Sequence, residues 1–102
     1  MITKLDEAKN LALFISEAIK DRKIIDDKDF DFAIEIAEEE IIARQAAGDY
    51  YLDHENPISG DSLAGLIIDA MFDGKIIEEN KFDDAINVVT RKIDQHRMNA
   101  TD

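Results

Sequence analysis

The side chains with the most evident chemistry are carboxylates, and one group of them follows helical spacing. Asp31, Glu35, Glu38 and Glu39 are separated by four, three and one residues, and Glu40 continues the run. Residues three and four apart lie on the same side of an α-helix, so we expect a shared face, which we call the acidic ridge (Asp31, Glu35, Glu38 and Glu39). Because charge complementarity steers association, the ridge predicts a binding surface for a basic partner protein. Ordinary solvation of a helix surface is the alternative.

Two adjacent tyrosines follow this segment in an acidic stretch of the chain. Tyr50 and Tyr51 lie between Asp49 and Asp53. Tyrosine is frequent at binding hot spots because its ring offers a large contact area and its hydroxyl offers one polar group. We therefore expect Tyr50, Tyr51 and Asp53 to extend the partner-binding surface. At least one tyrosine is expected to pack against the bundle instead.

The other reactive residues lack the spacing that catalysis or metal binding requires. The chain contains no cysteine, and its serines and glycines form no nucleophile elbow and no phosphate-binding loop. His54 and His96 have no second histidine three or four residues away, and neither belongs to a Glu-x-x-His motif. Such pairs are the usual signature of zinc ligands on a helix. The sequence therefore predicts a protein that is not an enzyme and has no metal site and no cofactor.

One short segment resembles a calcium-binding loop. Asp73-Gly74-Lys75-Ile76 is similar to the middle of an EF-hand loop, with an acidic residue, a turn glycine and an inward isoleucine. When Asp69 is counted as the first loop position, the third is Met71 and the twelfth is Asn80. Calcium needs oxygen ligands at both positions, with a bidentate glutamate at the twelfth. A structural turn is the favoured interpretation, and a degenerate EF-hand-like calcium site is the alternative.

The acidic excess restricts the kinds of partner. The chain has 24 acidic and 12 basic residues among 102, a formal net charge of −12. This charge repels phosphate backbones and anionic lipid surfaces. The sequence shows no signal peptide and no apolar run close to the length of about 18 residues that a membrane-spanning helix needs. We expect a cytoplasmic protein with a basic protein partner, no direct nucleic-acid contact and no membrane contact.

An internal repeat predicts the architecture. Shifting the chain by 52 residues aligns Leu11–Gln45 with Leu63–Arg97, and 13 of the 35 aligned pairs are identical. Chance would give roughly two or three identities, so the repeat indicates a duplication. A helix pair this short cannot bury its apolar side alone. We predict an all-α, four-helix bundle-like single domain over residues 1–102, built from two tandem helix-loop-helix repeats with pseudo-twofold symmetry.

The element boundaries follow from apolar spacing and from cap residues. The first repeat covers about residues 3–47, with helices over 3–21 and from Asp26 or Asp27 to near Gly48. A polar linker over about 48–59 contains Pro57, the only proline. The second repeat covers about 60–97, with Ser59 as the cap of its first helix, and the tail from Met98 is expected to fray.

The repeat also places two isoleucine pairs between helices. Ile24-Ile25 and Ile76-Ile77 occupy equivalent positions of the two copies. Such β-branched residues favour extended backbone, so the two segments are expected to meet. They either close the end of the core as an apolar plug or form a minimal two-strand bridge.

These observations favour a non-catalytic protein-protein interaction module. It would bind and inhibit or escort a basic protein, as an immunity protein, an antitoxin-like inhibitor or another anion-mimicking regulator does. The alternative is a helical scaffold that self-associates, as a possible homodimer, through apolar positions surplus to the core. Those positions are Phe32, Ile36, Ile42 and Phe72.

Overall fold

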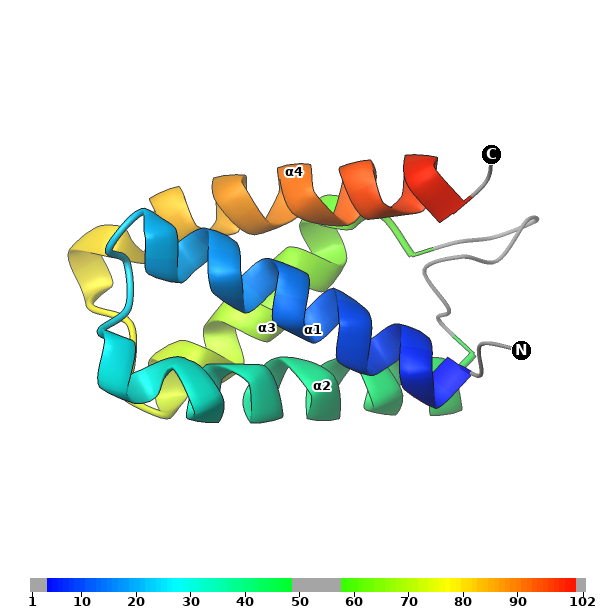
Figure 1. The fold of residues 1–102 in the computed structure, drawn as a ribbon, viewed down its shortest axis with the longest axis horizontal. Coiled ribbons are helices and arrows are strands. Elements are labelled where there is room, and N and C mark those ends of the chain that lie inside the picture. The colour runs from blue at the N-terminus through cyan, green and yellow to red at the C-terminus, as the bar shows by residue number, and fades with distance from the viewer. Residues whose placement is uncertain (1–3, 49–57, 101–102) are drawn as a thin grey trace.

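The computed structural model describes residues 4–48 and 58–100, and it is an all-α four-helix domain (Figure 1). Short 3-10 helices, Asp27–Asp29 and Glu79–Lys81, precede the second and fourth helices. The helices are α1 (Lys4–Asp21), α2 (Phe30–Ala46), α3 (Gly60–Asp73) and α4 (Phe82–Ala100). The prediction of an all-α domain with four helices is confirmed.

The helices pack as two pairs that cover each other. α1 contacts α2, α3 contacts α4, and the pairs meet through α1 with α4 and α2 with α3. Figure 1 shows both interhelical loops at the same end of the domain, with α1 in front of α3. Each helix therefore has two helical neighbours, and the core lies between all four.

The core consists of the apolar residues that recur at helical spacing. Ile15 and Ile67 are fully buried, and Ile34 and Ile86 are half-buried against the same cluster. Full burial of an aliphatic side chain of this size contributes roughly 1.5–3 kcal/mol. The two helix pairs thus share one core, as predicted. The largest fully buried apolar side chains are Leu11, Ile15, Ile19, Ile41, Leu63, Ile67, Ile68, Met71, Val89 and Ile93.

Several predicted helix ends are confirmed, and two are wrong. Ser59 caps α3, because its hydroxyl oxygen accepts a hydrogen bond of 3.4 Å from the backbone N–H of Ser62. Gly48 has a φ of 93°, the left-handed conformation expected just past α2. However, α2 begins at Phe30, because the preceding turn is a 3-10 helix rather than part of the α-helix.

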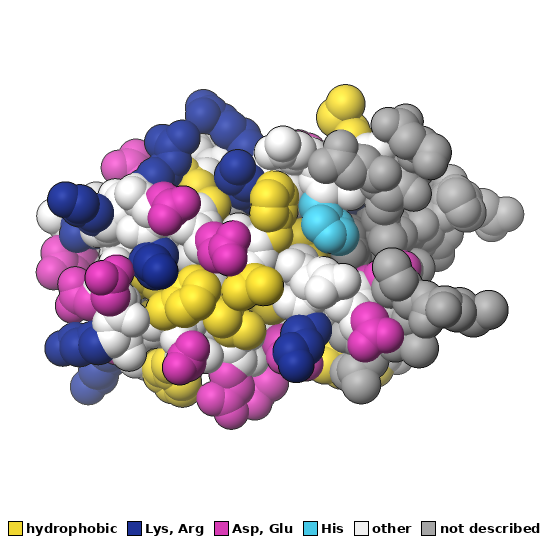
Figure 2. Space-filling view, in the orientation of Figure 1, with side chains coloured by type: hydrophobic (Ala, Val, Ile, Leu, Met, Phe, Trp, Pro, Cys, Tyr) yellow, Lys and Arg dark blue, Asp and Glu magenta, His cyan; other side chains and the backbone are white. Residues whose placement is uncertain are grey.

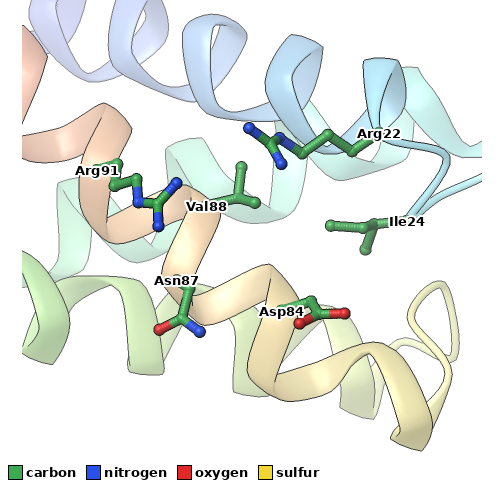
Figure 3. Close-up of a pocket in the computed structure, with 6 residues that line it drawn as sticks. All are labelled: Arg22, Ile24, Asp84, Asn87, Val88 and Arg91. Carbon is green, nitrogen blue, oxygen red and sulfur yellow. The ribbon is translucent and has the colours of Figure 1, made fainter.

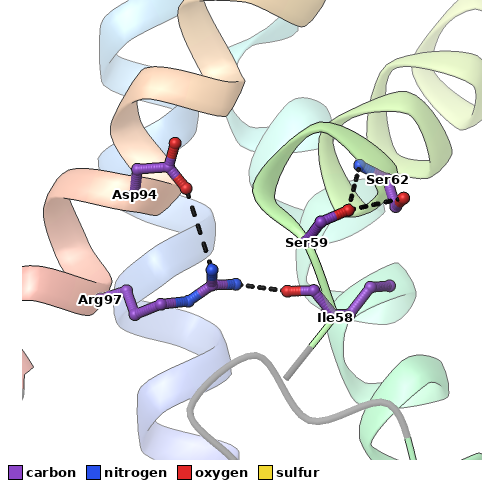
Figure 4. Close-up of polar contacts among 5 residues, drawn as sticks. All are labelled: Ile58, Ser59, Ser62, Asp94 and Arg97. Atoms are coloured by element: carbon purple, nitrogen blue, oxygen red, sulfur yellow. Dashed lines mark hydrogen bonds and ion pairs between the residues drawn. The ribbon is translucent and has the colours of Figure 1, made fainter. Parts of the chain in front are cut away.

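The expected fraying from Met98 is also wrong for residues 98–100, because α4 continues to Ala100. The Arg97 guanidinium donates a hydrogen bond to the backbone carbonyl of Ile58 and lies 3.9 Å from the Asp94 carboxylate (Figure 4). These contacts attach the last turns of α4 to the start of α3. Residues 98–102 include no proline or glycine that would end the helix earlier.

The two interhelical loops begin with the same backbone geometry. Lys23 and Lys75 have φ angles of 61° and 64°. Ile24 donates its backbone N–H to Ile19, and Ile76 donates to Met71, at 2.9 and 3.1 Å. This is the Schellman arrangement that ends α-helices. In the Asp73-Gly74-Lys75 segment, therefore, the left-handed residue is Lys75 and not the expected turn glycine, whose φ is −78°.

The isoleucine pairs close the core at the loop end. Ile24, Ile25 and Ile77 are buried and Ile76 is half-buried. Neither loop forms a strand or bridge within residues 22–29 or 74–81. The Lys81 ammonium donates a hydrogen bond of 3.2 Å to the Lys23 carbonyl, which joins the two loops. These segments therefore form the apolar plug and not the two-strand bridge.

Candidate partner-binding surface

The acidic ridge lies on the outer side of α2. Asp31, Glu35 and Glu39 are exposed and Glu38 is half-buried. Within residues 4–48 and 58–100, no hydrogen bond or ion pair engages these four carboxylates. Figure 2 shows acidic side chains along the edge that α2 forms. The ridge therefore presents negative charge that no described basic side chain neutralises.

The structure places an exposed aromatic ring beside the ridge. Phe32 is 47% exposed, the largest exposed fraction among the exposed aromatic side chains of the described chain. At about 100° per residue, Phe32, Glu35 and Glu39 lie within about 60° of one another around α2. We call these three residues the Phe32 face. An aromatic ring among unpaired carboxylates combines an apolar anchor with an acidic rim.

The other predicted site residues have different outcomes. Glu40 is half-buried and lies about 100° further around α2 than Glu39, so it does not continue the ridge. Tyr50, Tyr51 and Asp53 lie outside the described residues, and their expected role stays a prediction. The described part of the site is therefore confined to α2.

The outer side of α4 carries a different set of charges. The 52-residue register aligns Glu35 with Asn87, Glu39 with Arg91, and Glu40 with Lys92. The Lys92 ammonium lies 5.0 Å from the centre of the Phe14 ring, so it packs against α1 as a cation-π pair. Arg91 is exposed in the middle of α4, too far from the helix end for the macrodipole to explain it.

His96 belongs to the packing between α1 and α4. Its ring centre lies 6.0 Å from that of Phe14, with an interplanar angle of 46°. Burial lowers the pKa of His96 below 6.5, and the negative charge of Glu7 offsets part of this shift. In Figure 2 the only described histidine is at the surface beside an apolar side chain. The neutral imidazole is therefore favoured in the folded protein.

The described residues do not assemble a metal centre. Across residues 4–48 and 58–100, no group of three or more His, Asp or Glu side chains is arranged to hold a metal ion. Met71, the third position of the EF-hand-like count, is fully buried in the core. The Met71 side chain is therefore part of the core of the bundle. None of the described helices is long and apolar enough to cross a bilayer.

Comparison with protein-family models, curated proteins and solved structures found no match to this chain. The geometry of α2 alone therefore defines the candidate site. Sequence reasoning found the carboxylates but grouped Phe32 with the self-association positions. The signal that joins them is the spacing of three and seven residues from Phe32 to Glu35 and Glu39.

Proposed function

We propose that this protein is a non-catalytic interaction module that binds a basic partner protein through the Phe32 face and inhibits or escorts it. The observation that carries the proposal is the exposed Phe32 ring beside two unpaired carboxylates, Glu35 and Glu39. Complexes of this kind include those of immunity proteins, antitoxin-like inhibitors and other anion-mimicking regulators. The partner chemistry is an apolar pocket surrounded by lysine and arginine.

The two components of the face have separate roles in binding. Burial of the Phe32 ring in the partner's pocket supplies affinity, because aromatic anchors at the centre of an interface carry much of the binding energy. The carboxylates act mainly on the association rate, which falls as salt screens the attraction. The net charge of −12 strengthens this attraction at long range.

The experiment uses matched baits on a resin at low salt. The test variant is E35K/E39K, and the control is D69K/D73K, which makes the same charge change at the same four-residue spacing on α3. Asp69 and Asp73 are also exposed. A partner captured by the wild type and the control, but not by E35K/E39K, supports the proposal. Equal capture by all three baits contradicts it.

Self-association is the second candidate function, and exposed aromatic rings support it. Phe72 is 37% exposed and packs edge-to-face on Phe82, with ring centres 5.6 Å apart. Phe32 is also exposed, whereas Ile36 and Ile42 are half-buried. Sedimentation equilibrium distinguishes the candidates: a stable dimer that F32A dissociates favours the scaffold, and a monomer favours the interaction module.

We further infer that the domain arose by duplication of one helix-loop-helix unit, with a pseudo-twofold axis relating the two pairs. The repeated sequence and the equal geometry of the two loops support this inference. Duplication would leave two equivalent outer surfaces free to diverge in charge. The contrast between Glu39 on α2 and Arg91 on α4 fits such divergence.

A further inference from the structure

A second surface feature lies where the end of α1 meets α4. A cavity of about 330 Å³ is lined by Arg22, Ile24, Asp84, Asn87, Val88 and Arg91. Its size is at the lower end of the range for small-molecule sites. Ile24 and Val88 are buried and form an apolar floor, whereas the four polar residues are exposed.

The two arginines reach this cavity from different segments, Arg22 from the turn that follows α1 and Arg91 from α4. Figure 3 shows the Arg22 side chain extending from the end of α1 and the Arg91 side chain from α4, with Val88 between their guanidinium groups. Within the described residues, neither guanidinium forms an ion pair or a hydrogen bond. Two like charges thus approach the same cavity although the chain has twice as many acidic as basic residues.

The cavity occupies the position that corresponds to the Phe32 face in the other copy. The 52-residue register aligns Asp84 with Phe32, Asn87 with Glu35, and Arg91 with Glu39. It also aligns Arg22 with Gly74 and Val88 with Ile36. The Ile36 side chain of the first copy reaches Gly74 of the second copy, since its Cδ1 would lie 3.2 Å from a Cβ at that glycine. At the equivalent junction, Val88 of the second copy is shorter than Ile36, and Arg22 of the first copy is longer than Gly74.

We propose that Arg22 and Arg91 form a binding site for a compact oxyanion, of the phosphate or carboxylate class, carried by a small molecule. The planar guanidinium group matches such anions because it donates two parallel hydrogen bonds to two oxygens. Asn87 supplies a further amide donor at the cavity wall. The Asp84 carboxylate repels the anion and therefore lowers the affinity of the site.

This site goes beyond partner binding through the Phe32 face, because it has the opposite charge and lies on other helices. Together, the two proposals assign a basic protein to the outer surface of α2 and a small anion to the equivalent surface of α4. The Phe32 face is intact in every variant described next, so failure of one proposal does not affect the other.

The test is a titration of isotope-labelled protein with inorganic phosphate at constant ionic strength and pH. Binding is measured by the changes in the amide chemical shifts. The site predicts saturable shifts centred on Arg22, Ile24 and residues 84–91. Removal of one guanidinium in R22Q or R91Q should weaken the affinity for phosphate about tenfold. The control K9Q removes an exposed positive charge from the outer side of α1 and should leave the affinity unchanged.

A second pair of variants tests the role of the cavity carboxylate. D84N should tighten phosphate binding several-fold, because it removes the negative charge that lines the cavity. D83N removes the same charge from the neighbouring exposed position, which does not line the cavity, and should have a smaller effect. The proposal is overturned if phosphate causes no saturable shifts, if K9Q weakens binding as much as R91Q, or if D83N and D84N are equivalent.

Discussion

Lys23 and Lys75, 52 residues apart, adopt the same left-handed backbone conformation, with φ angles of 61° and 64°. Each follows the end of a helix, and each precedes an isoleucine whose backbone N–H closes the Schellman arrangement. This conformation costs an L-residue about 1–2 kcal/mol relative to glycine. The protein therefore accepts the same local strain at both helix ends that lead into the isoleucine plug.

Glycine at either position should stabilise the protein. K23G or K75G removes the steric cost and adds about 0.5–1 kcal/mol of backbone entropy to the unfolded chain, so the net gain is about 0.5–1 kcal/mol each. Urea unfolding measures the difference. The control K28G lies in the 3-10 helix at a residue without positive φ and should lower the free energy of unfolding. A K23G variant no more stable than K28G would contradict the strain argument.

Ser16 is a polar defect in the core, and its removal should also be stabilising. Its side chain is fully buried, and its hydroxyl has no hydrogen-bond partner among the described residues. The register aligns it with Ile68, another fully buried core residue. S16A removes the desolvated hydroxyl and should raise the free energy of unfolding by about 1 kcal/mol. The control S62A removes an exposed hydroxyl that is hydrogen-bonded to Ser59, so the free energy of unfolding should not rise.

The stability of the fold should decrease at mildly acidic pH because of His96. Burial lowers the pKa of this histidine in the folded protein, with partial compensation by Glu7, so the unfolded chain binds the proton more readily. Its contribution is therefore complete above pH 6.5 and declines as pH falls from 6.5 toward the lower folded pKa. Thermal unfolding as a function of pH measures this dependence.

Two variants separate His96 from the carboxylates that titrate at lower pH. H96Q should lose the part of the pH dependence that lies just below 6.5. E7Q should increase it, because the negative charge that favours the protonated ring is removed. If H96Q retained the full decrease in melting temperature over this pH range, another group would be responsible.

Much of the fold could be predicted because it depends on local patterns. The apolar spacing in each copy determines which faces of the helices are buried, and Ser59 and Gly48 mark helix ends through their own backbone chemistry. The start of α2 could not be predicted as well. A 3-10 turn and an α-helical turn accept the same acidic residues, so Asp27–Asp29 carries no signal that distinguishes them.

The candidate sites could be predicted only in part, since they depend on contacts between distant segments. The carboxylates of α2 are visible in the sequence because they lie on one helix. The exposure of Phe32 is not, because helical spacing alone does not show which apolar side chains lie beyond the core. The approach of Arg22 to Arg91 joins α1 to α4 across 69 positions of the chain, and no local pattern predicts it.

The most direct test of the central claim is the association rate of the captured basic partner with four proteins: wild type, F32A, E35K/E39K and D69K/D73K. Stopped-flow fluorescence at low salt and at about 0.15 M salt supplies this rate. We predict that E35K/E39K slows association at least tenfold at low salt, whereas F32A mainly speeds dissociation. D69K/D73K should change both rates less. An association rate of E35K/E39K equal to that of D69K/D73K at low salt would contradict binding through the Phe32 face.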